Sequence, residues 1–376
     1  MSARDSNPRR VLIRSVNWLG DVVMTLPAIE RIRAGWPDAS FSVLAPSKLA
    51  DLWRMQSFVD EVIETDKKES VLSLGRRLRA LKFDAAVVLP NSPRTALEVW
   101  LAGIPLRAGY GGGVRSLFLT GAIPRRTDVV TMRKRTEGEI RALVAEQNSA
   151  PRDPVPVESH HVSHYLHLAK ALGFDDALSA PKLEVTPDAL AAFQDKFLSP
   201  EQREWIVKGS PLIGINPGAD YGPAKRWPTP RFVETAAMVN ERTPAVVAVF
   251  GGPGDEVGLE VVARLNEQIG AERVVKLVGE TSLGELLAGL KSCKVMVSND
   301  SGPMHVAAAL GTPIVGIFGS TSMELTGPGM PGKMPEGLLQ EPVPCSPCFL
   351  RACPIDFRCM NSLQVERVVE AVMKEL

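Results

Sequence analysis

The sequence predicts an α/β protein with two halves, each built on a parallel sheet. Short apolar segments alternate with helix-like segments along most of the 376 residues, and this alternation is typical of parallel sheets that helices cover on both faces. The length suits two domains of about 100–200 residues each. The composition, 45% hydrophobic and 23% charged, is that of a globular protein and argues against disorder or a coiled coil.

Elements of the first half follow from apolar runs and from helical spacing of apolar residues. The predicted strands are residues 11–13, 41–44 and 85–89, and the predicted helices are residues 20–32, 72–81 and 160–172. Residues 148–157, which are rich in proline and polar side chains, are expected to form a loop. Residues 181–187 are expected to connect the two halves.

A second alternating set makes up the rest of the chain. The predicted strands are residues 212–215, 245–250, 274–277, 295–297 and 314–318, and the predicted helices include residues 229–242 and 363–376. Thr229 suits the N-cap of its helix and Pro230 the first helical position. Both halves are therefore Rossmann-like, and ligands of such sheets bind in the loops beyond the carboxyl ends of the strands.

The basic residues are concentrated in the first half. Residues 1–150 carry 23 Lys and Arg against 16 Asp and Glu, a net charge of +7, and the remaining residues balance this at −7. The asymmetry suggests an anionic partner: a phosphorylated substrate, an anionic membrane surface or, with least support, a nucleic acid. The alternative is two domains that merely differ in their solvated surfaces.

Neither a secretory signal nor a membrane span is apparent in the sequence. The first ten residues are polar and precede only a short apolar stretch, unlike a secretory signal. No apolar run approaches the roughly 20 residues that a spanning helix needs. We therefore expect a soluble, cytoplasmic protein.

The first motif, Ser15–Asp21, directly follows the first predicted strand. Gly20 permits a close approach of a ligand or chain, and Asp21 falls in the first turn of the following helix. An acid at this position favours the helix dipole, which is a purely structural explanation. The same position suits a general base at the mouth of a binding site.

The second motif, Asn216–Pro228, follows the first strand of the second half and leads into a helix. Its glycines, Gly218 among them, offer backbone N–H groups, and Lys225 and Arg226 supply positive charge. Both features suit a diphosphate. The order of residues is not that of a Walker loop, and an ordinary surface loop is the alternative.

The third motif, Ser298–His305, follows the strand at residues 295–297. Ser301 and Gly302 fall at the start of the next helix, where free N–H groups and the dipole form a ready anion site. His305 lies one turn further on and could donate to a phosphate oxygen. Residues 251–256 form another glycine-containing loop after a strand, which we assign loosely to a nucleoside.

Two clusters resemble metal sites. His160, His161, His164 and His167 share helical faces, but no Asp or Cys nearby completes a ligand set, so we interpret them as part of an exposed linker helix. Cys345, Cys348, Cys353 and Cys359 could bind a structural zinc ion or be reduced cysteines in a cytoplasmic chain. With Cys293 the count is odd, which argues against a complete disulfide framework.

In combination, these motifs identify a known family. The chain resembles the ADP-heptose:lipopolysaccharide heptosyltransferases in the strings NWLGDVVMTLPAIERIR, NPGADYGPAKRWP and SNDSGPMH, the last followed by VAAALGTPIVGIFG. Residues 91–110 are also similar to that family, and the likeness runs from about residue 10 to the C-terminus.

This resemblance implies a GT-B fold: two facing Rossmann-like domains with parallel sheets and a cleft between them. Residues 10–185 would bind the acceptor and residues 186–360 the ADP-sugar. Residues 361–376 would form a closing helix able to pack back on the N-terminal domain.

The resemblance also implies an activity. It is the inverting, metal-independent transfer of L-glycero-D-manno-heptose from ADP-heptose to the inner core of lipopolysaccharide, with heptosyl-Kdo2-lipid A as the expected acceptor and no cofactor required. The enzyme would work at the cytoplasmic face of the inner membrane as a peripheral protein.

By the same resemblance, Asp21 matches the catalytic base. The residues expected to bind the donor are Lys225, Asp300, Ser301, Gly302, His305, Gly218 and Thr281. Because the acceptor is a phosphorylated glycolipid, we expect the basic first half to bind it, through Arg94, Arg107 and Arg115 in or near its loops.

Other functions remain open from the sequence. The acceptor could be another position of the core, and a UDP-sugar epimerase would share the two-domain architecture. An NAD-dependent oxidoreductase is disfavoured because Ser15–Gly20, after the first strand, lacks the Gly-x-Gly-x-x-Gly turn. A nucleotide-binding module without activity would leave the Gly20–Asp21 pair unexplained.

Overall fold

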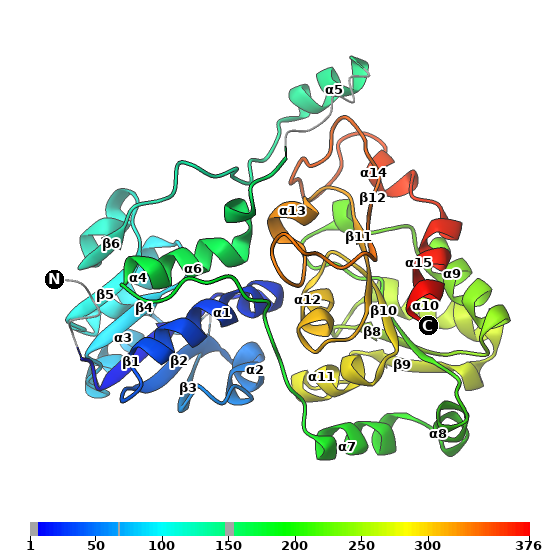
Figure 1. Ribbon diagram of the computed structural model, residues 1–376, viewed down its shortest axis with the longest axis horizontal. Coiled ribbons are helices and arrows are strands. Elements are labelled where there is room, and N and C mark those ends of the chain that lie inside the picture. Colours follow the sequence, from blue (N-terminus) through cyan, green and yellow to red (C-terminus); the bar gives the residue numbers. More distant parts are fainter. Residues whose placement is uncertain (1–6, 67, 147–153) are drawn as a thin grey trace. The chain divides into compact units, whose positions relative to one another are not determined.

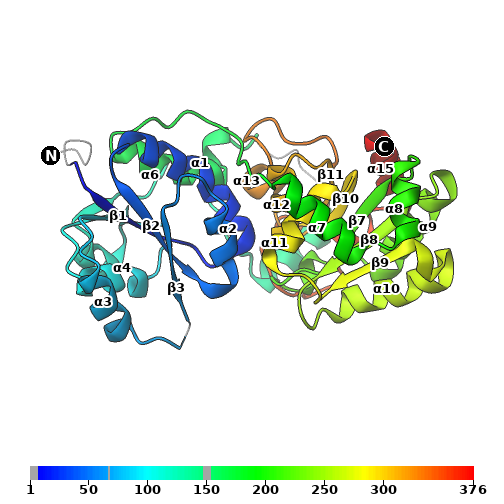
Figure 2. The same cartoon turned by 90° about the horizontal axis from the view of Figure 1, so that it is seen from below.

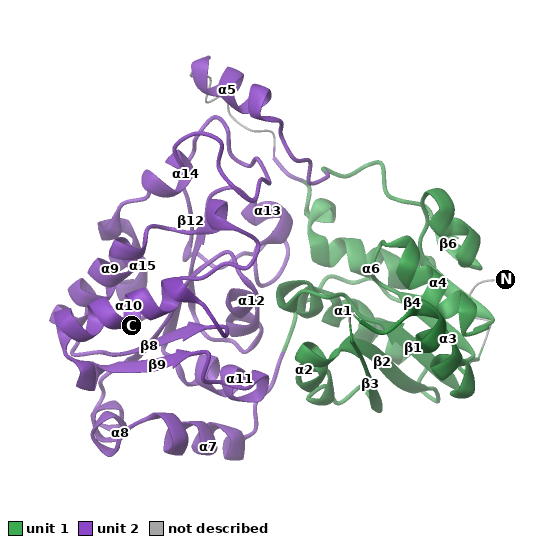
Figure 3. Ribbon diagram, turned by 180° about the vertical axis from the view of Figure 1, so that it is seen from behind, with its two compact units in different colours: residues 1–130, 156–182 green, residues 131–155, 183–376 purple. Residues whose placement is uncertain are grey.

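The computed structural model describes residues 7–66, 68–146 and 154–376 (Figure 1). The chain divides into two compact units (Figure 3): unit 1 comprises Met1–Val130 and Pro156–Lys182, and unit 2 comprises Thr131–Val155 and Leu183–Leu376. The segment between residues 130 and 156 thus groups with unit 2, whereas the sequence analysis assigned it to the first domain. Residues 148–153 of the loop predicted there lie outside the described residues.

Unit 1 contains a six-stranded sheet in the order β3-β2-β1-β4-β5-β6, and all neighbouring strands are parallel. The strands are β1 Arg10–Arg14, β2 Ser40–Pro46, β3 Glu61–Thr65, β4 Ala85–Val88, β5 Leu106–Tyr110 and β6 Gly121–Ile123. At the centre, Leu12 of β1 aligns with Ser42 of β2 and Ala86 of β4. Both central strands are buried, as expected for a sheet covered on both faces.

Helices cover the two faces of this sheet (Figure 2). On one face lie α1 (Leu19–Gly35) and α6 (His161–Ala171), which pack along each other. On the other lie α3 (Val71–Ala80) and α4 (Pro93–Leu101), which share a core cluster with the strands. The histidine-rich helix is therefore not the exposed linker that we expected. Its Val162, Tyr165 and Leu166 are buried, because they form the apolar side that α1 requires.

Unit 2 contains a second six-stranded parallel sheet, in the order β12-β11-β10-β7-β8-β9. The strands are β7 Leu212–Asn216, β8 Val246–Gly251, β9 Val274–Val278, β10 Val295–Asn299, β11 Ile314–Phe318 and β12 Leu338–Gln340. The predicted α/β class with two parallel sheets is thus confirmed.

Helices lie on both sides of this second sheet (Figure 1). On one face are α9 (Thr229–Arg242), α10 (Glu256–Ile269) and α15 (Val365–Glu375), and on the other are α7 (Pro187–Phe197), α11 (Leu283–Ser292) and α12 (Gly302–Ala309). The C-terminal helix α15 buries Val368, Val369 and Val372 in the core of unit 2. Its apolar face is thus occupied within unit 2, and the expected contact of this helix with the first domain stays a prediction.

Shorter elements complete the chain. They are η2 Ser47–Leu49, α2 Ala50–Arg54, η3 Gly113–Phe118 and η4 Val157–Ser159 in unit 1, and α5 Glu137–Ala145, α8 Pro200–Val207, η5 Pro223–Lys225, η6 Ala271–Arg273, α13 Met323–Thr326 and α14 Arg358–Asn361 in unit 2. Among the described residues, none of the helices has the length and apolar character needed to cross a membrane.

Both sheets share the strand order in which the first and fourth strands are neighbours. The chain moves outward in one direction from β1 and in the other from β4, and the same reversal occurs between β7 and β10. Ligands of such sheets bind at this reversal, beyond the carboxyl ends of the strands. The fold thus directs the search for a site to the loops after β1 and β4 in unit 1 and after β7 and β10 in unit 2.

Candidate active site

In unit 2 the loop after β7, residues 217–228, carries Lys225 and is hereafter the Lys225 loop. Gly218 in this loop has no room for a side chain, because an added Cβ would lie 2.4 Å from Asp255 Oδ2. The turn η5 then brings Lys225 back toward the sheet. The loop is fastened to the neighbouring strand β10 by Asn299, whose Nδ2 donates to Pro217 O at 2.7 Å and whose Oδ1 accepts from Trp227 N at 3.0 Å.

Lys225 forms an ion pair with Asp300, the residue that follows β10. Lys225 Nζ lies 2.5 Å from Asp300 Oδ2, and the two side chains are only 14% and 4% exposed. Thr321 Oγ1 donates to the same oxygen at 2.6 Å, and His305 Nε2 lies 3.9 Å from Asp300 Oδ1. Each charge of this buried pair compensates the other. Separating the two side chains would leave an uncompensated buried charge, so the pair stays together.

The surroundings of Asp300 keep it ionised. Burial alone would raise the pKa of this carboxyl, but the charges of Lys225 and His305 and the hydrogen bonds from Lys225 and Thr321 outweigh burial, so that its pKa lies below the usual value. The carboxylate is therefore a fixed negative charge at neutral pH, and it fixes the position of the Lys225 ammonium.

The start of α12 lies beside this pair. Ser301 is the N-cap residue, yet its side chain does not cap the helix. Instead its Oγ accepts from Asn216 Nδ2 at 3.1 Å and lies 3.0 Å from Ser298 Oγ. The N–H groups of the first turn, which begins at Gly302, thus receive no bond from Ser301. They and the dipole of α12 can bind an anion.

Among the predicted donor residues, Thr281 stands apart. It follows β9, at the edge of the sheet, whereas Lys225 and Asp300 follow the central strands β7 and β10. The loops after β8 and β9 contact each other, since Gly279 N donates to Gly251 O at 2.9 Å. Thr281 therefore belongs to a second pair of loops, which follow β8 and β9 at the same end of the strands.

Sequence reasoning missed the polar residues that organise the ion pair: Asn216, Asn299, Thr321 and Tyr221. Asn216 and Asn299 end β7 and β10, so their place at adjacent strand ends was a usable signal. Thr321 had none, because it comes from the loop after β11, 21 residues from Asp300. Tyr221 lies with its ring centroid 4.9 Å from Lys225 Nζ.

In unit 1, Asp21 lies in the first turn of α1, directly after the loop that follows β1. Its side chain is 32% exposed, and its Oδ1 lies 4.0 Å from Nδ1 of His161, at the start of α6. Burial lowers the pKa of His161 to about 4, so that its imidazole is neutral at pH 7. Asp21 is thus accessible and faces a neutral neighbour, as a base that must accept a proton requires.

The three arginines proposed for the acceptor differ in their surroundings. Arg94 is half exposed, with its Nε 3.3 Å from Glu98 Oε1. Arg107 donates to Phe118 O at 2.7 Å and to Ile104 O, and burial lowers the pKa of its guanidinium. Of the three, Arg94 has the most accessible guanidinium.

Arg115 departs most from its expected role. It is 1% exposed. Its guanidinium donates to the carbonyl oxygens of Tyr110, Ser92 and Val88 and to Thr95 Oγ1. Burial lowers the pKa of this side chain to about 10. Arg115 joins β4, β5 and α4 from inside, so it is not available to an acceptor, and we correct that expectation.

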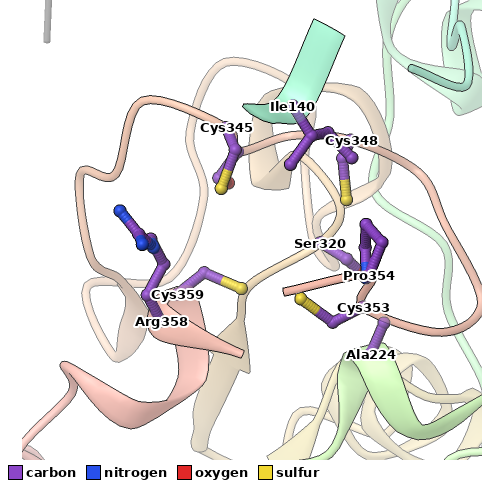
Figure 4. A pocket seen from close by; sticks show the side chains of 10 residues that line it. Ile140, Ala224, Ser320, Cys345, Cys348, Cys353, Pro354, Arg358 and Cys359 are labelled. Carbon is purple, nitrogen blue, oxygen red and sulfur yellow. The ribbon is translucent and has the colours of Figure 1, made fainter. Parts of the chain in front are cut away.

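Four of the five cysteines line one small cavity in unit 2 (Figure 4). Its volume is about 10 Å³, and the sulfur atoms of Cys345, Cys348, Cys353 and Cys359 point toward it. Burial raises the pKa of Cys359 to about 12 and also raises the pKa of Cys345 and Cys348, so these thiols stay protonated. Within the described residues, no three or more His, Cys, Asp or Glu could together hold a metal ion, which leaves the zinc expectation unsupported.

The geometry therefore offers an anion site in unit 2 and an accessible carboxylate in unit 1. The sequence profile of glycosyltransferase family 9 (heptosyltransferase) matches residues 129–357. The chain belongs to this family. The family that the motifs resembled is confirmed.

Individual relatives agree with the family. The chain is 32% identical to lipooligosaccharide heptosyltransferase 2 of Haemophilus influenzae over 85% of each chain. It is also 32% identical to lipopolysaccharide heptosyltransferase 2 of Escherichia coli K12, again over 85% of each. Among solved structures, it is similar to E. coli ADP-heptose lps heptosyltransferase II, with a TM-score of 0.74, 28% identity and coverage of 97% of this chain and 98% of the other.

Proposed function

We propose that this family 9 glycosyltransferase transfers L-glycero-D-manno-heptose from ADP-heptose to heptosyl-Kdo2-lipid A during synthesis of the lipopolysaccharide core. The relatives with 32% identity are named heptosyltransferase 2, and the similar solved structure bears ADP-heptose in its name. The similarity to these relatives extends over 85% of each chain. It favours the same acceptor over an acceptor that receives heptose at another position of the core.

The observation that carries the donor assignment is the buried Lys225–Asp300 pair beside the start of α12. A departing ADP gains negative charge on its diphosphate, and fixed donors stabilise that charge without reorganising during the reaction. Lys225, the backbone N–H groups of Gly302 and Met304, and His305 supply such donors. They perform the charge stabilisation that a metal ion provides in other transferases, so we propose a metal-independent reaction that needs no cofactor.

Asp21 is the proposed base. It would accept the proton of the acceptor hydroxyl while that oxygen attacks the anomeric carbon and ADP leaves, a single displacement that inverts the anomeric configuration. The 32% exposure of Asp21 and its neutral neighbour His161 support this role. A general base of this kind typically contributes about 10²–10⁴ in rate.

The acceptor is a phosphorylated glycolipid, which we assign to unit 1. Residues 1–150 carry a net charge of +7, and Arg94 presents a half-exposed guanidinium after β4, where the strand order reverses. We propose that the enzyme acts as a peripheral protein at the cytoplasmic face of the inner membrane, with this basic unit toward the anionic acceptor.

The test is ADP release from ADP-heptose with two acceptors in parallel: Kdo2-lipid A without heptose, and the same lipid already carrying one heptose. Release with the heptose-bearing acceptor alone is the expected result. Release with the bare acceptor alone would keep the family and move the enzyme to the first heptose. No release with either, from folded protein, would contradict the proposal and direct attention to UDP-sugars.

A further inference from the structure

In the donor site as described, the charge of Lys225 is already compensated, and Arg226 of the same loop is partly buried. Asp300 lies 2.5 Å from Lys225 Nζ and compensates its charge within the protein. The diphosphate of a nucleoside-diphosphate sugar carries two negative charges, and phosphate groups are bound most strongly by charge-assisted hydrogen bonds. A further cation, not already paired with a carboxylate, would complete the site.

The loop that holds the cysteines, residues 345–359 and hereafter the cysteine loop, lies directly against the Lys225 loop. Tyr221 Oη donates to Phe349 O at 2.7 Å, and Ala224 N donates to Arg351 O at 3.0 Å. The approach is so close that Gly222, with φ of +150°, has no room for a side chain: an added Cβ would lie 2.4 Å from Arg351 O. Backbone contacts therefore fix Arg351 beside the Lys225 loop.

The side chains of Arg351 and Lys225 both lie close to the aromatic ring of Tyr221. Arg351 Cζ lies 5.3 Å and Lys225 Nζ 4.9 Å from the ring centroid of Tyr221, distances at which a cation is attracted to an aromatic face. Arg351 is exposed, and within the part of the chain that the structure describes no carboxylate forms an ion pair with it. Two cations on one ring repel each other unless an anion binds near them.

A second set of contacts ties the cysteine loop to Asp300. The backbone N–H groups of Cys348 and Phe349 donate to Ser320 O at 3.0 and 2.7 Å. The next residue, Thr321, donates to Asp300. Ala224 and Ser320 border the cavity that the cysteines line (Figure 4). The loop is thus anchored to the segment that carries Lys225 and to the segment that carries Thr321, a hydrogen-bond donor of Asp300.

We propose that Arg351 is a donor-binding residue, the unpaired cation that receives the diphosphate of the nucleotide sugar together with Lys225. This inference rests on the proposed function, because it assumes that the Lys225 site binds the donor. Arginine suits this role, since its planar guanidinium can donate two hydrogen bonds to one phosphate.

The experiment compares R351A and R351K with wild type and with R358A. Arg358 lies in the same loop, but Asp356 already pairs with it at 2.9 Å, so R358A is a matched control for the loss of an exposed-loop arginine. Binding of ADP, AMP and adenosine is measured by calorimetry at two salt concentrations. We expect R351A to weaken ADP binding by about tenfold, AMP binding by less and adenosine binding not at all.

R351K should recover part of the ADP affinity and the salt dependence, and R358A should behave as wild type. Wild-type ADP affinity in R351A, or an equal loss of affinity for adenosine, would overturn the inference. A different result marks failure of the proposed function itself: wild-type protein that binds no ADP, or K225A protein with unchanged ADP affinity.

Discussion

The two sheets share one strand order but carry different kinds of site where that order reverses. In unit 2 the charged groups are buried and already paired, with Asp300 4% exposed. Unit 1 also has a buried pair, Arg14 with Glu98, but two of its charged groups remain accessible: the side chain of Asp21 is 32% exposed and that of Arg94 51%. A diphosphate is small and identical in every turnover, so a rigid site suits it. A glycolipid acceptor is large, and its reacting hydroxyl must reach the base from outside.

The largest effect is expected in unit 1, from Asp21→Asn. The amide keeps the shape of the side chain but cannot accept the hydroxyl proton, so kcat should fall by about 10³-fold, while ADP affinity stays at the wild-type value. Steady-state rates and ADP calorimetry on the same preparation make the measurement. Turnover near that of wild type would remove Asp21 as the base and would erase the functional contrast between the units.

In unit 2, Lys225→Ala should affect binding and stability together. It leaves Asp300 buried without its cation, which costs about 3–5 kcal/mol of unfolding free energy, and it weakens ADP binding. The double variant Lys225→Ala/Asp300→Ala should regain part of the stability but not the ADP affinity. Denaturant unfolding and ADP calorimetry check both. If the stability losses of the two single variants add up to the loss of the double variant, the two side chains are not coupled as the 2.5 Å contact requires.

Acid should weaken unit 1 through its histidines. Burial lowers the pKa of His161 to about 4 and that of His164 to about 3, below the usual value of about 6.5. The unfolded chain therefore binds more protons between pH 6.5 and 4, and stability must fall as the pH is lowered through this window, by roughly 2–3 kcal/mol for each histidine. Hydrogen exchange of the α1 and α6 amides reports this change within unit 1.

The variant His164→Phe sharpens that test, because its ring can still stack on Tyr110, as His164 does at 4.1 Å, but cannot titrate. Relative to its own value at pH 8, the stability of the variant should fall less with decreasing pH than the stability of wild type does. An unchanged slope would assign the acid sensitivity to groups other than His164.

The smallest effect is expected from Arg94→Ala. The buried partner Glu98 keeps its 2.8 Å pair with Arg14, so stability should change little, whereas salt-sensitive binding to vesicles containing the acceptor should weaken a few-fold. Arg115→Ala is the matched contrast: it removes the donors of four protein oxygens and should cost about 1–3 kcal/mol of stability. Equal vesicle binding by wild type and Arg94→Ala would contradict the acceptor role.

Most of the architecture could be predicted from the sequence, because local patterns of apolar residues determine the strands and helices. Apolar runs located β1, β7 and β10, and the motifs after them fell at the two strand-order reversals. The sequence could also suggest that Lys225 and Asp300 belong to one site. It could not reveal that they neutralise each other, since 75 residues separate them and only the parallel pairing of β7 with β10 brings them together.

Other roles depended on packing that no local pattern encodes. Arg115 has the flanking residues of a loop arginine, yet the turn η3 folds it under β5. The histidine-rich helix α6 has enough polar residues for an exposed linker, yet its apolar side packs against α1. Arg351 was hidden among cysteines that suggested metal chemistry, and it is related to the proposed donor site by its contacts with Tyr221, Gly222 and Ala224.

The division of unit 1 into two stretches of chain has a consequence for synthesis. All six strands of its sheet have left the ribosome once Ile123 emerges, but α6, which covers α1, begins only at His161, after the segment that joins unit 2. Until then the side of α1 that α6 covers has no partner from its own unit. The nascent enzyme therefore passes through an interval in which a finished sheet carries an uncovered helix, and cellular chaperones would find their binding surface there.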